Sequence, residues 1–284
     1  MTKVLKKEIQ LKGNAIQKTI TADITFLPTG KPKPLVIFLH GFKGFKDWGP
    51  WHLIAHQFAE EGFCFCKFNF SHNGVVPENL TDLTDAEAFG YNNFSKEMED
   101  MDRLLDHLTM NENLKSFEIN EKEIYMIGHS RGGGLGIIRT FEDVRIKKLA
   151  TWAAVHDFAG RFSNEELDYW KKNEVIYAQN SRTGEKYPMY YQFVEDFLAN
   201  KDRFFIRQAI ENTHKPILIV HGTKDETVHV NAAFALHEWQ PKATLFILPE
   251  ANHVFGASHP FLSNTLPEML KKASIRTAQF FKRG

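Results

Sequence analysis

Short runs of apolar residues alternate with amphipathic stretches along most of the chain. A run of about five apolar residues without polar alternation is typical of a strand buried on both faces of a sheet. Between several runs, apolar residues recur at a three-to-four spacing, which predicts helices. The expected strands are Leu35–Leu39, Gly62–Phe70, Glu123–Ile127, Lys148–Val155, Pro216–Val220 and Thr244–Leu248, and the expected helices are Trp51–Glu61, Ser95–Met110 and Asn264–Phe281. This alternation predicts an α/β fold with a mostly parallel central sheet and helices on both faces.

Two regions depart from that rhythm. Lys18–Leu27 is rich in Thr and Ile with partial alternation, which predicts an antiparallel strand paired with Glu8–Leu11. Between Val155 and Pro216 lie about sixty residues, whereas a plain crossover needs roughly a dozen. This segment is dense in Tyr, Phe and Trp and partly helical in pattern. We therefore expect a single domain over residues 1–284 that carries a helical cap inserted at about 156–213.

Composition narrows the class of protein. Hydrophobic residues make up 43% and charged residues 25% of the chain, as in ordinary globular proteins. Lys plus Arg equals Asp plus Glu at 35 each, so no global field favours nucleic acid or an anionic membrane. No apolar run approaches the roughly 18 residues of a membrane span, and the N-terminus lacks the apolar stretch of a secretory signal. We expect a cytoplasmic protein with neither nucleic-acid nor membrane partners.

Metal and redox sites have little support in the sequence. The two cysteines, Cys64 and Cys66, lie in an expected strand, and no further cysteine completes a metal site. We interpret both as reduced core residues. His52 and His56 have a metal-ligand spacing, but they lack the Glu of H-E-x-x-H, and a helix face is the simpler account. No cofactor and no metal are expected.

The motif with the most specific context is Gly128–Gly132, a G-x-S-x-G sequence centred on Ser130. It follows an expected buried strand and precedes a Gly-rich segment that enters an expected helix. A sharp turn between strand and helix is the arrangement of a nucleophile elbow. The alternative is a Gly-rich turn that holds an ordinary serine.

A serine nucleophile needs a base. Among 13 histidines, His253 follows the last expected strand, so it can reach the same sheet edge as Ser130. We expect His221 to shape the loop at its strand end and His229 and His237 to lie on a helix. The histidines that compete with His253 are His214, His221, His229, His237 and His259.

The base in turn needs an acid. Asp225 lies in the loop after the strand Pro216–Val220. The resulting chain order, Ser, Asp, His, is the order found in folds whose serine lies at a nucleophile elbow. Glu226 is the competing carboxylate. The alternative role for Asp225 is a helix N-cap before Thr227.

An oxyanion hole needs two backbone N–H donors. The expected donors are Arg131, which follows the nucleophile, and Phe42, which follows the strand ending at Leu39. Lys43 and Lys46 lie beside Phe42. We interpret them as solvated loop charges; the alternative is that they attract an acidic substrate.

The segments HGF, GHSRGG, HGTKDETV and ANHVF occur in this order. In this respect the chain, from about Leu35 to its C-terminus, resembles the α/β-hydrolase superfamily, and more narrowly bacterial cinnamoyl and feruloyl esterases and dienelactone-hydrolase-like proteins. The resemblance implies Ser130 as nucleophile, Asp225 as acid, His253 as base, and the N–H groups of Phe42 and Arg131 as oxyanion donors. It also implies an insertion that caps the acyl pocket. At position 131 an Arg stands where those esterases are expected to have Gln or Met.

Together these features predict a serine hydrolase that cleaves carboxylic esters, of short-chain or hydroxycinnamoyl acids, through an acyl-enzyme. The expected partner is a small-molecule ester, and a homodimer stays open. Some cap aromatics are expected to line the pocket, among Tyr169, Trp170, Tyr177, Tyr190, Tyr191, Phe193 and Phe197. The alternatives are a peptidase, thioesterase or lipase on the same fold, or a binding module that has lost catalysis.

Overall fold

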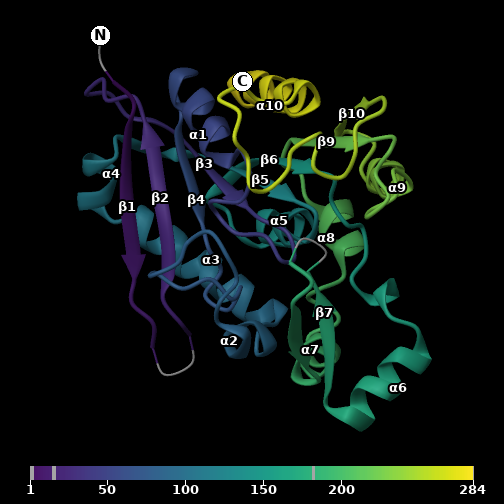
Figure 1. The fold of residues 1–284 in the computed structure, drawn as a ribbon. Coiled ribbons are helices and arrows are strands. Elements are labelled where there is room, and N and C mark those ends of the chain that lie inside the picture. Colours follow the sequence, from purple (N-terminus) through teal and green to yellow (C-terminus); the bar gives the residue numbers. More distant parts are fainter. Residues whose placement is uncertain (1–2, 15–16, 181–182, 284) are drawn as a thin grey trace.

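The computed structural model, which describes residues 3–14, 17–180 and 183–283, has an α/β fold (Figure 1). Eight strands of these residues form one sheet in the order β1-β2-β4-β3-β5-β6-β9-β10. From β4 to β10 neighbouring strands pair in parallel, whereas β1 and β2 are antiparallel. The strands are β1 (Leu5–Leu11), β2 (Ile20–Phe26), β3 (Lys33–Leu39), β4 (Cys64–Phe68), β5 (Ile119–His129), β6 (Ile146–Trp152), β9 (Ile217–Gly222) and β10 (Thr244–Leu248). The predicted mostly parallel sheet is confirmed.

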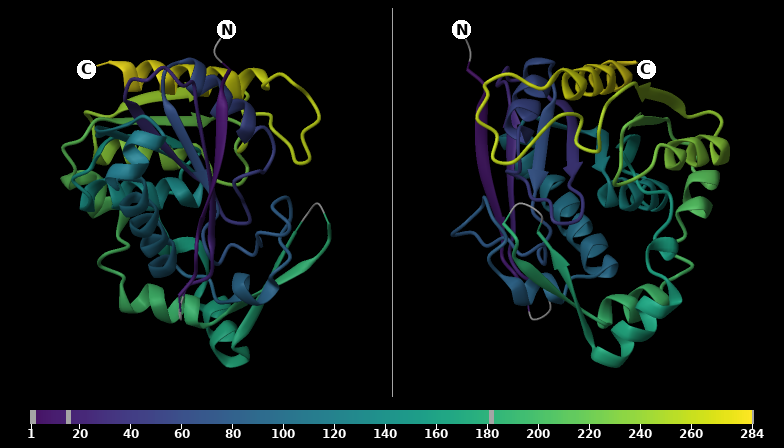
Figure 2. Two further views of the ribbon diagram at one scale, coloured as in Figure 1. Left: turned by 90° about the vertical axis from the view of Figure 1, so that its left-hand side faces the viewer. Right: turned by 45° about the vertical axis from the view of Figure 1, so that its right-hand side comes forward.

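Helices cover both faces of this sheet, because successive side chains of each buried strand point to opposite sides. In β3, Val36 and Phe38 pack in a cluster with α1 and α10, whereas Leu35, Ile37 and Leu39 pack with α3, α5 and α9. Figure 2 shows the two layers from further directions. These helices are α1 (Trp51–Glu60), α3 (Phe94–Leu108), α5 (Arg131–Glu142), α9 (Asn231–Trp239) and α10 (Glu268–Lys282); two shorter ones are α2 (Ala86–Gly90) and α4 (Asn111–Ser116).

The N-terminal strands and the cysteines are as the sequence predicts. Strand β1 pairs with β2 from Leu5 opposite Phe26 to Leu11 opposite Ile20. Cys64 and Cys66 are free and buried in β4. Burial raises the pKa of the Cys64 thiol to about 12, so this cysteine is an unreactive core residue.

Most of the segment between β6 and β9 lies at the bottom of Figure 1, on the opposite side of the molecule from α10, and its last helix, α8, returns to the level of α5. We call this segment the cap. Besides the predicted helices it contains a β-hairpin, because β7 and β8 pair as a separate two-stranded sheet. Residues 181–182 of the expected cap lie outside the described residues. The cap elements are a 3-10 helix (Ala159–Arg161), α6 (Asn164–Asn173), β7 (Val175–Gln179), β8 (Lys186–Tyr190), α7 (Gln192–Ala199) and α8 (Ile206–Asn212).

Aromatic packing holds the cap together and joins it to the sheet domain. Trp170 is completely buried and donates its indole N–H to the Met189 carbonyl at 2.8 Å. Its ring stacks on Phe193 with centroids 6.0 Å apart, and Phe193 lies 4.8 Å from Phe94 of α3. The Tyr187 hydroxyl of the hairpin bonds the Leu83 carbonyl at 3.2 Å. The cap therefore rests on α3 and on the segment that follows β4. None of the described helices is both long and apolar enough to cross a membrane.

Candidate active site

Ser130 lies in a strained turn between β5 and α5. Its φ of 56° and ψ of −121° are values that non-glycine residues rarely adopt, and such strain costs about 1–3 kcal/mol. Its N–H donates to the Trp152 carbonyl at 2.9 Å, and its carbonyl accepts from the Gly133 N–H at 2.9 Å. A Cβ at Gly132 would lie 2.5 Å from the His40 carbonyl oxygen, so a glycine is required there. The predicted strand, sharp turn and helix are therefore present.

Asp225 and His253 come together from the loops after β9 and β10. His253 Nδ1 lies 2.8 Å from Asp225 Oδ2. The Asp225 side chain is fully buried, and its Oδ1 accepts the N–H groups of Thr227 at 2.9 Å and Val228 at 2.8 Å. Asp225 thus contacts His253 and also stabilises the turn formed by residues 225–228. The competing carboxylate, Glu226, is exposed.

Hydrogen bonding fixes the ionisation of this carboxylate. Burial alone would raise the pKa of Asp225, but hydrogen bonds from His221, His253 and the Val228 N–H hold that pKa well below its usual range. Because an ionised carboxylate only accepts, His253 Nδ1 must carry the proton. The other ring nitrogen, Nε2, is then free to accept a proton in the pocket.

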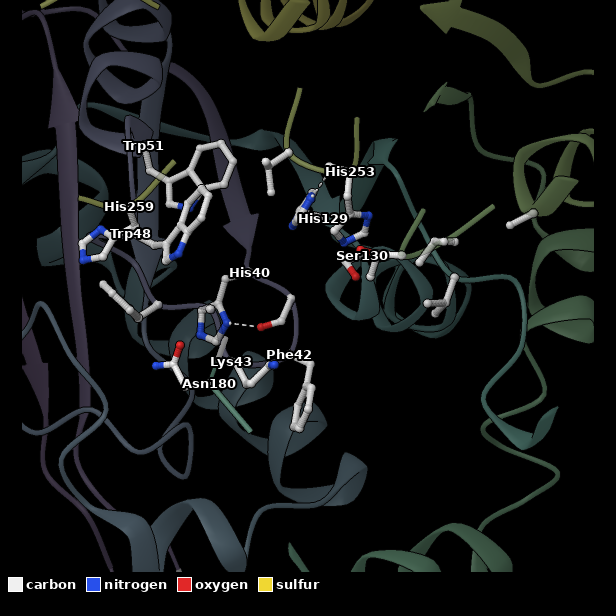
Figure 3. A pocket seen from close by; sticks show the side chains of 18 of the residues that line it. His40, Phe42, Lys43, Trp48, Trp51, His129, Ser130, Asn180, His253 and His259 are labelled. Atoms are coloured by element: carbon white, nitrogen blue, oxygen red, sulfur yellow. Dashed lines mark hydrogen bonds between the residues drawn. The ribbon is translucent and has the colours of Figure 1, made fainter. Parts of the chain in front are cut away.

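Ser130 and His253 line the same pocket (Figure 3). Among the described residues, no hydrogen bond joins the Ser130 hydroxyl to His253. Such contacts often tighten only when substrate is bound. The structure therefore brings all three predicted residues to one place and directly pairs two of them.

His129, the residue before Ser130, ties the turn at Ser130 to the loop that carries His253. Its Nε2 lies 2.9 Å from the His253 carbonyl oxygen, and the two rings are 4.8 Å apart. Since a carbonyl only accepts, His129 Nε2 is the donor. Burial lowers the pKa of His129 to about 3, so its ring is neutral. No role for His129 was predicted from the sequence; its place inside the G-x-S-x-G motif was the available signal.

The other histidines divide between loops and helices. His221 lies with Nε2 2.8 Å from the Val228 carbonyl, which agrees with its predicted role in shaping the loop. His237 is on α9 as predicted. The prediction that His229 lies on a helix is wrong, because α9 begins only at Asn231 and His229 lines the pocket. Bonds from Asp225 and His221 to residues 227–228 keep this stretch in a turn.

The loop between β3 and α1, residues 40–50, brings Phe42 to the serine. We call it the oxyanion loop. A Cβ at Gly41 would lie 2.9 Å from Ser130 Cβ, so only glycine permits this approach. His40 donates from Nδ1 to the Gly41 carbonyl at 2.9 Å. Arg131 is the first residue of α5, so its N–H has no acceptor within the helix.

The interpretation of Lys46 as a solvated charge is wrong. Its side chain is 2% exposed and bonds Asp23 at 2.8 Å and Asp47 at 2.5 Å. Lys67 bonds the same two carboxylates, at 2.9 and 2.5 Å. Pairing of β2 with β4 places Asp23 opposite Lys67, which the sequence alone does not show. Lys43 is half-buried and donates to the Gln179 carbonyl of the cap at 2.9 Å.

The pocket has a volume of about 1060 Å³. Four aromatic residues form what we call the aromatic wall: Phe45, Trp48, Trp51 and His259. Within this wall, Trp48 lies 5.5 Å from Trp51 and 6.1 Å from His259, and Figure 3 shows the three gathered on one side. Polar residues also line the pocket, including Asp82, His156, Asp157, Asn180, Thr227, His229 and Asn231. Phe45, Trp48 and Trp51 come from the oxyanion loop and the start of α1. His259 joins them from the segment after β10, a contact between distant residues that the sequence alone does not show.

A smaller cavity of about 30 Å³ adjoins the cap and is lined by Phe42, Arg131 and several aromatic residues. The cap aromatics expected to line the pocket do not border the pocket of about 1060 Å³. Phe193 lines the smaller cavity instead, and Tyr169 and Tyr177 are exposed. In the described part of the chain, no group of three or more His, Cys, Asp or Glu residues could hold a metal ion. His52 and His56 are exposed on α1.

Comparison with protein families identifies the family of the chain. The sequence model of the BD-FAE family matches residues 23–240. The chain belongs to the BD-FAE family. Members are carboxylic ester hydrolases with the α/β-hydrolase fold. The matched residues include Ser130 and Asp225 and end before His253, whose place rests on the geometry alone.

Solved structures agree on the fold. Est1E from Butyrivibrio proteoclasticus is 18% identical with a TM-score of 0.66, and the match covers 97% of this chain and 99% of Est1E. A putative dienelactone hydrolase from Klebsiella pneumoniae is 12% identical, with a TM-score of 0.63 and coverage of 99% and 100%. A putative hydrolase from Agrobacterium vitis S4 is 16% identical, with a TM-score of 0.70 and coverage of 99% and 100%. A search of curated proteins finds no significant match.

Proposed function

We propose that this esterase cleaves acetyl and feruloyl esters through an acyl-enzyme on Ser130, with His253 as base and Asp225 as acid. The observation that carries the proposal is the 2.8 Å hydrogen bond between His253 and a buried, ionised Asp225, beside a serine held in a strained turn. A serine at such a turn and a histidine oriented by a carboxylate are the parts that acyl transfer needs.

The reaction follows from the proton positions. His253 Nε2 takes the proton from Ser130 Oγ as the oxygen attacks the ester carbonyl carbon. Negative charge develops on the carbonyl oxygen, which the backbone N–H groups of Phe42 and Arg131 bind. The ester C–O bond breaks, and the imidazolium of His253 protonates the leaving alcohol. Water, deprotonated by His253, then attacks the acyl-enzyme. The bond between the acyl carbon and Ser130 Oγ breaks, the imidazolium of His253 returns its proton to Oγ, and the acid is released.

The substrate proposal rests on the family and on the pocket. The family name denotes bifunctional feruloyl and acetyl esterases, and the structure of Est1E has been solved with ferulic acid bound. Ligand pockets span roughly 300–1,000 Å³. A pocket of about 1060 Å³ is at the upper end of that range and is larger than a small acid requires. Trp48 is half-buried and lines the pocket, so its ring is accessible to an aromatic acyl group.

The test is hydrolysis of p-nitrophenyl acetate, p-nitrophenyl octanoate and methyl ferulate by the wild-type protein and by Ser130→Ala. We expect the wild type to cleave the acetate and the ferulate, and the variant to lose at least about 1,000-fold in kcat. Full activity in Ser130→Ala would exclude the acyl-enzyme. Faster cleavage of an aminoacyl anilide than of either ester would instead indicate a peptidase.

A further inference from the structure

The side chain of Arg131 is buried in an ion pair that the ester chemistry does not itself require. Arg131 and Glu97 of α3 are bonded through Nη2 and Oε1, with side chains 8% and 1% exposed. The same Glu97 oxygen accepts from Asn92 Nδ2 at 2.8 Å. The second oxygen, Oε2, is buried and has no hydrogen-bond partner among the described residues. A buried carboxylate left half-satisfied is unfavourable for folding.

The guanidinium of Arg131 also touches the other proposed oxyanion residue. Its Cζ lies 4.8 Å from the centre of the Phe42 ring, within cation–π range. In Figure 3 the Phe42 ring extends away from the Ser130 and His253 side chains. The Phe42 ring also packs against Phe89, with ring centres 5.5 Å apart. The side chains of Phe42 and Arg131, whose N–H groups are the proposed oxyanion donors, are therefore in contact with each other.

A second ion pair between the same two helices provides a comparison. Arg139 of α5 bonds Asp102 of α3 at 2.6 Å, and the Asp102 side chain is 42% exposed. Arg139 lies two helical turns beyond Arg131 and does not line either cavity. This pair joins α3 to α5 without burying a whole carboxylate. Joining the helices thus does not require the fully buried pair next to Ser130.

We propose that Glu97 and the Arg131 side chain are positioning residues, which clamp the Phe42 ring so that the two oxyanion N–H groups stay at a fixed separation. This inference rests on the proposed function. The ion pair with Glu97 fixes the position of the Arg131 guanidinium. The guanidinium packs on the Phe42 ring, and the position of this ring fixes the backbone N–H of Phe42. Burial raises the pKa of Glu97 despite the opposing effect of Arg131. Burying the charged carboxylate is therefore unfavourable, which agrees with a role for the ion pair in geometry and not in stability. Such preorganisation of donors is a major source of rate enhancement.

The first test compares Arg131→Met with Arg139→Met on p-nitrophenyl acetate. Removal of one oxyanion donor costs about 100- to 1,000-fold in kcat, so a displaced donor in Arg131→Met should lower kcat by about 10- to 100-fold. KM should change by less than about threefold, because ground-state contacts are kept. Arg139→Met should keep the wild-type kcat. Equal loss of kcat in both variants would overturn the proposal.

The double variant Glu97→Leu/Arg131→Met separates positioning from stability. Replacing a buried ion pair by apolar side chains is often neutral or stabilising, so the double variant should unfold at or above the wild-type temperature. Its kcat should stay low, since Phe42 lacks the guanidinium. Recovery of kcat together with the unfolding temperature would assign the pair a merely structural role.

A fluorophosphonate probe makes the inference testable even without ester turnover. The probe phosphonylates an activated serine, and its phosphoryl oxygen needs the same donors. We expect Arg131→Met to react about 10- to 100-fold more slowly than Arg139→Met, in line with the loss of donor alignment. If the wild type labels but cleaves no ester, the proposed substrate class fails, and slower labelling of Arg131→Met than of Arg139→Met still supports the clamp. If both variants label at equal rates, the clamp fails and the proposed function stands.

Discussion

The sheet domain and the cap are held by different kinds of contact. Around the proposed active site the anchors are buried polar ones, such as the bonds of Asp225 and the network of Lys46 with Asp23 and Asp47. In the cap the contacts are mainly aromatic, and its buried hydrogen bonds include those of the Trp170 indole and the Tyr187 hydroxyl. Hydrogen bonds and ion pairs fix direction, whereas apolar packing constrains mainly volume.

This difference bears on what each region does. Acyl transfer needs atoms placed to within a fraction of an ångström, which directional contacts supply. A pocket that admits a substrate needs a suitable volume and surface. We therefore expect changes in the sheet domain to affect stability and the chemical step, and changes in the cap to affect substrate binding. Three substitutions test this expectation.

Lys46→Met should have the largest effect on stability. The substitution leaves Asp23 and Asp47 to share Lys67 as their cation, and breaking a buried ion pair costs about 3–5 kcal/mol. Urea unfolding monitored by fluorescence would measure the free energy of unfolding. The control is Lys272→Met, whose partner Glu268 is exposed; it should change stability by less than about 0.5 kcal/mol. A loss below about 1 kcal/mol in Lys46→Met would show that the network does not anchor the oxyanion loop.

Trp170→Ala should weaken substrate binding and leave the chemistry unchanged. We expect KM for methyl ferulate to rise about tenfold, or roughly 1.4 kcal/mol, while kcat on p-nitrophenyl acetate stays within about twofold. Hydrogen exchange should speed up in the cap and not in the sheet. The matched control is Tyr169→Ala at the neighbouring residue, whose side chain is exposed. An equal fall of kcat on both esters would show that the cap helps to place the catalytic groups.

The third substitution concerns the acid stability of the sheet domain. Burial lowers the pKa of His40 and of His72 to about 4 and that of His129 to about 3. Because the unfolded chain binds protons near pH 6.5 and the folded one does not, stability should fall as pH drops from about 6.5 to 4. His72→Gln should reduce this slope by up to about 1.4 kcal/mol per pH unit. Unfolding midpoints at pH 5 and 7.5 would measure it, with the exposed His52→Gln as control; an unchanged slope in His72→Gln would contradict the assignment.

The sheet was predictable because its signals are local. Unbroken apolar runs mark strands that are buried on both faces, and the order of Ser130, Asp225 and His253 follows strand ends. His253 could be chosen among 13 histidines by its place after the last strand alone. Its bond to Asp225 in the structure agrees with that choice.

The missed features depend on contacts between distant residues. Lys46 has the local sequence of an exposed loop, and its burial follows from Asp23 and Lys67 on neighbouring strands. The cap hairpin was hidden because dense aromatic residues obscure the alternation typical of a strand. Glu97 lies on the acidic-looking helix α3, and nothing in its sequence neighbourhood indicates that it faces Arg131.

The two ends of the cap meet at neighbouring strands. The cap leaves the sheet after β6 and returns at β9, and these strands are hydrogen-bonded from Leu149 opposite Ile217 to Trp152 opposite Val220. Because the two ends of the cap adjoin, an inserted segment of different length can replace it without altering the register of any strand. A longer closed loop adds little entropy cost. Evolution, or a designer grafting the cap of a relative, can thus exchange this segment without moving the strand ends that carry the proposed catalytic residues.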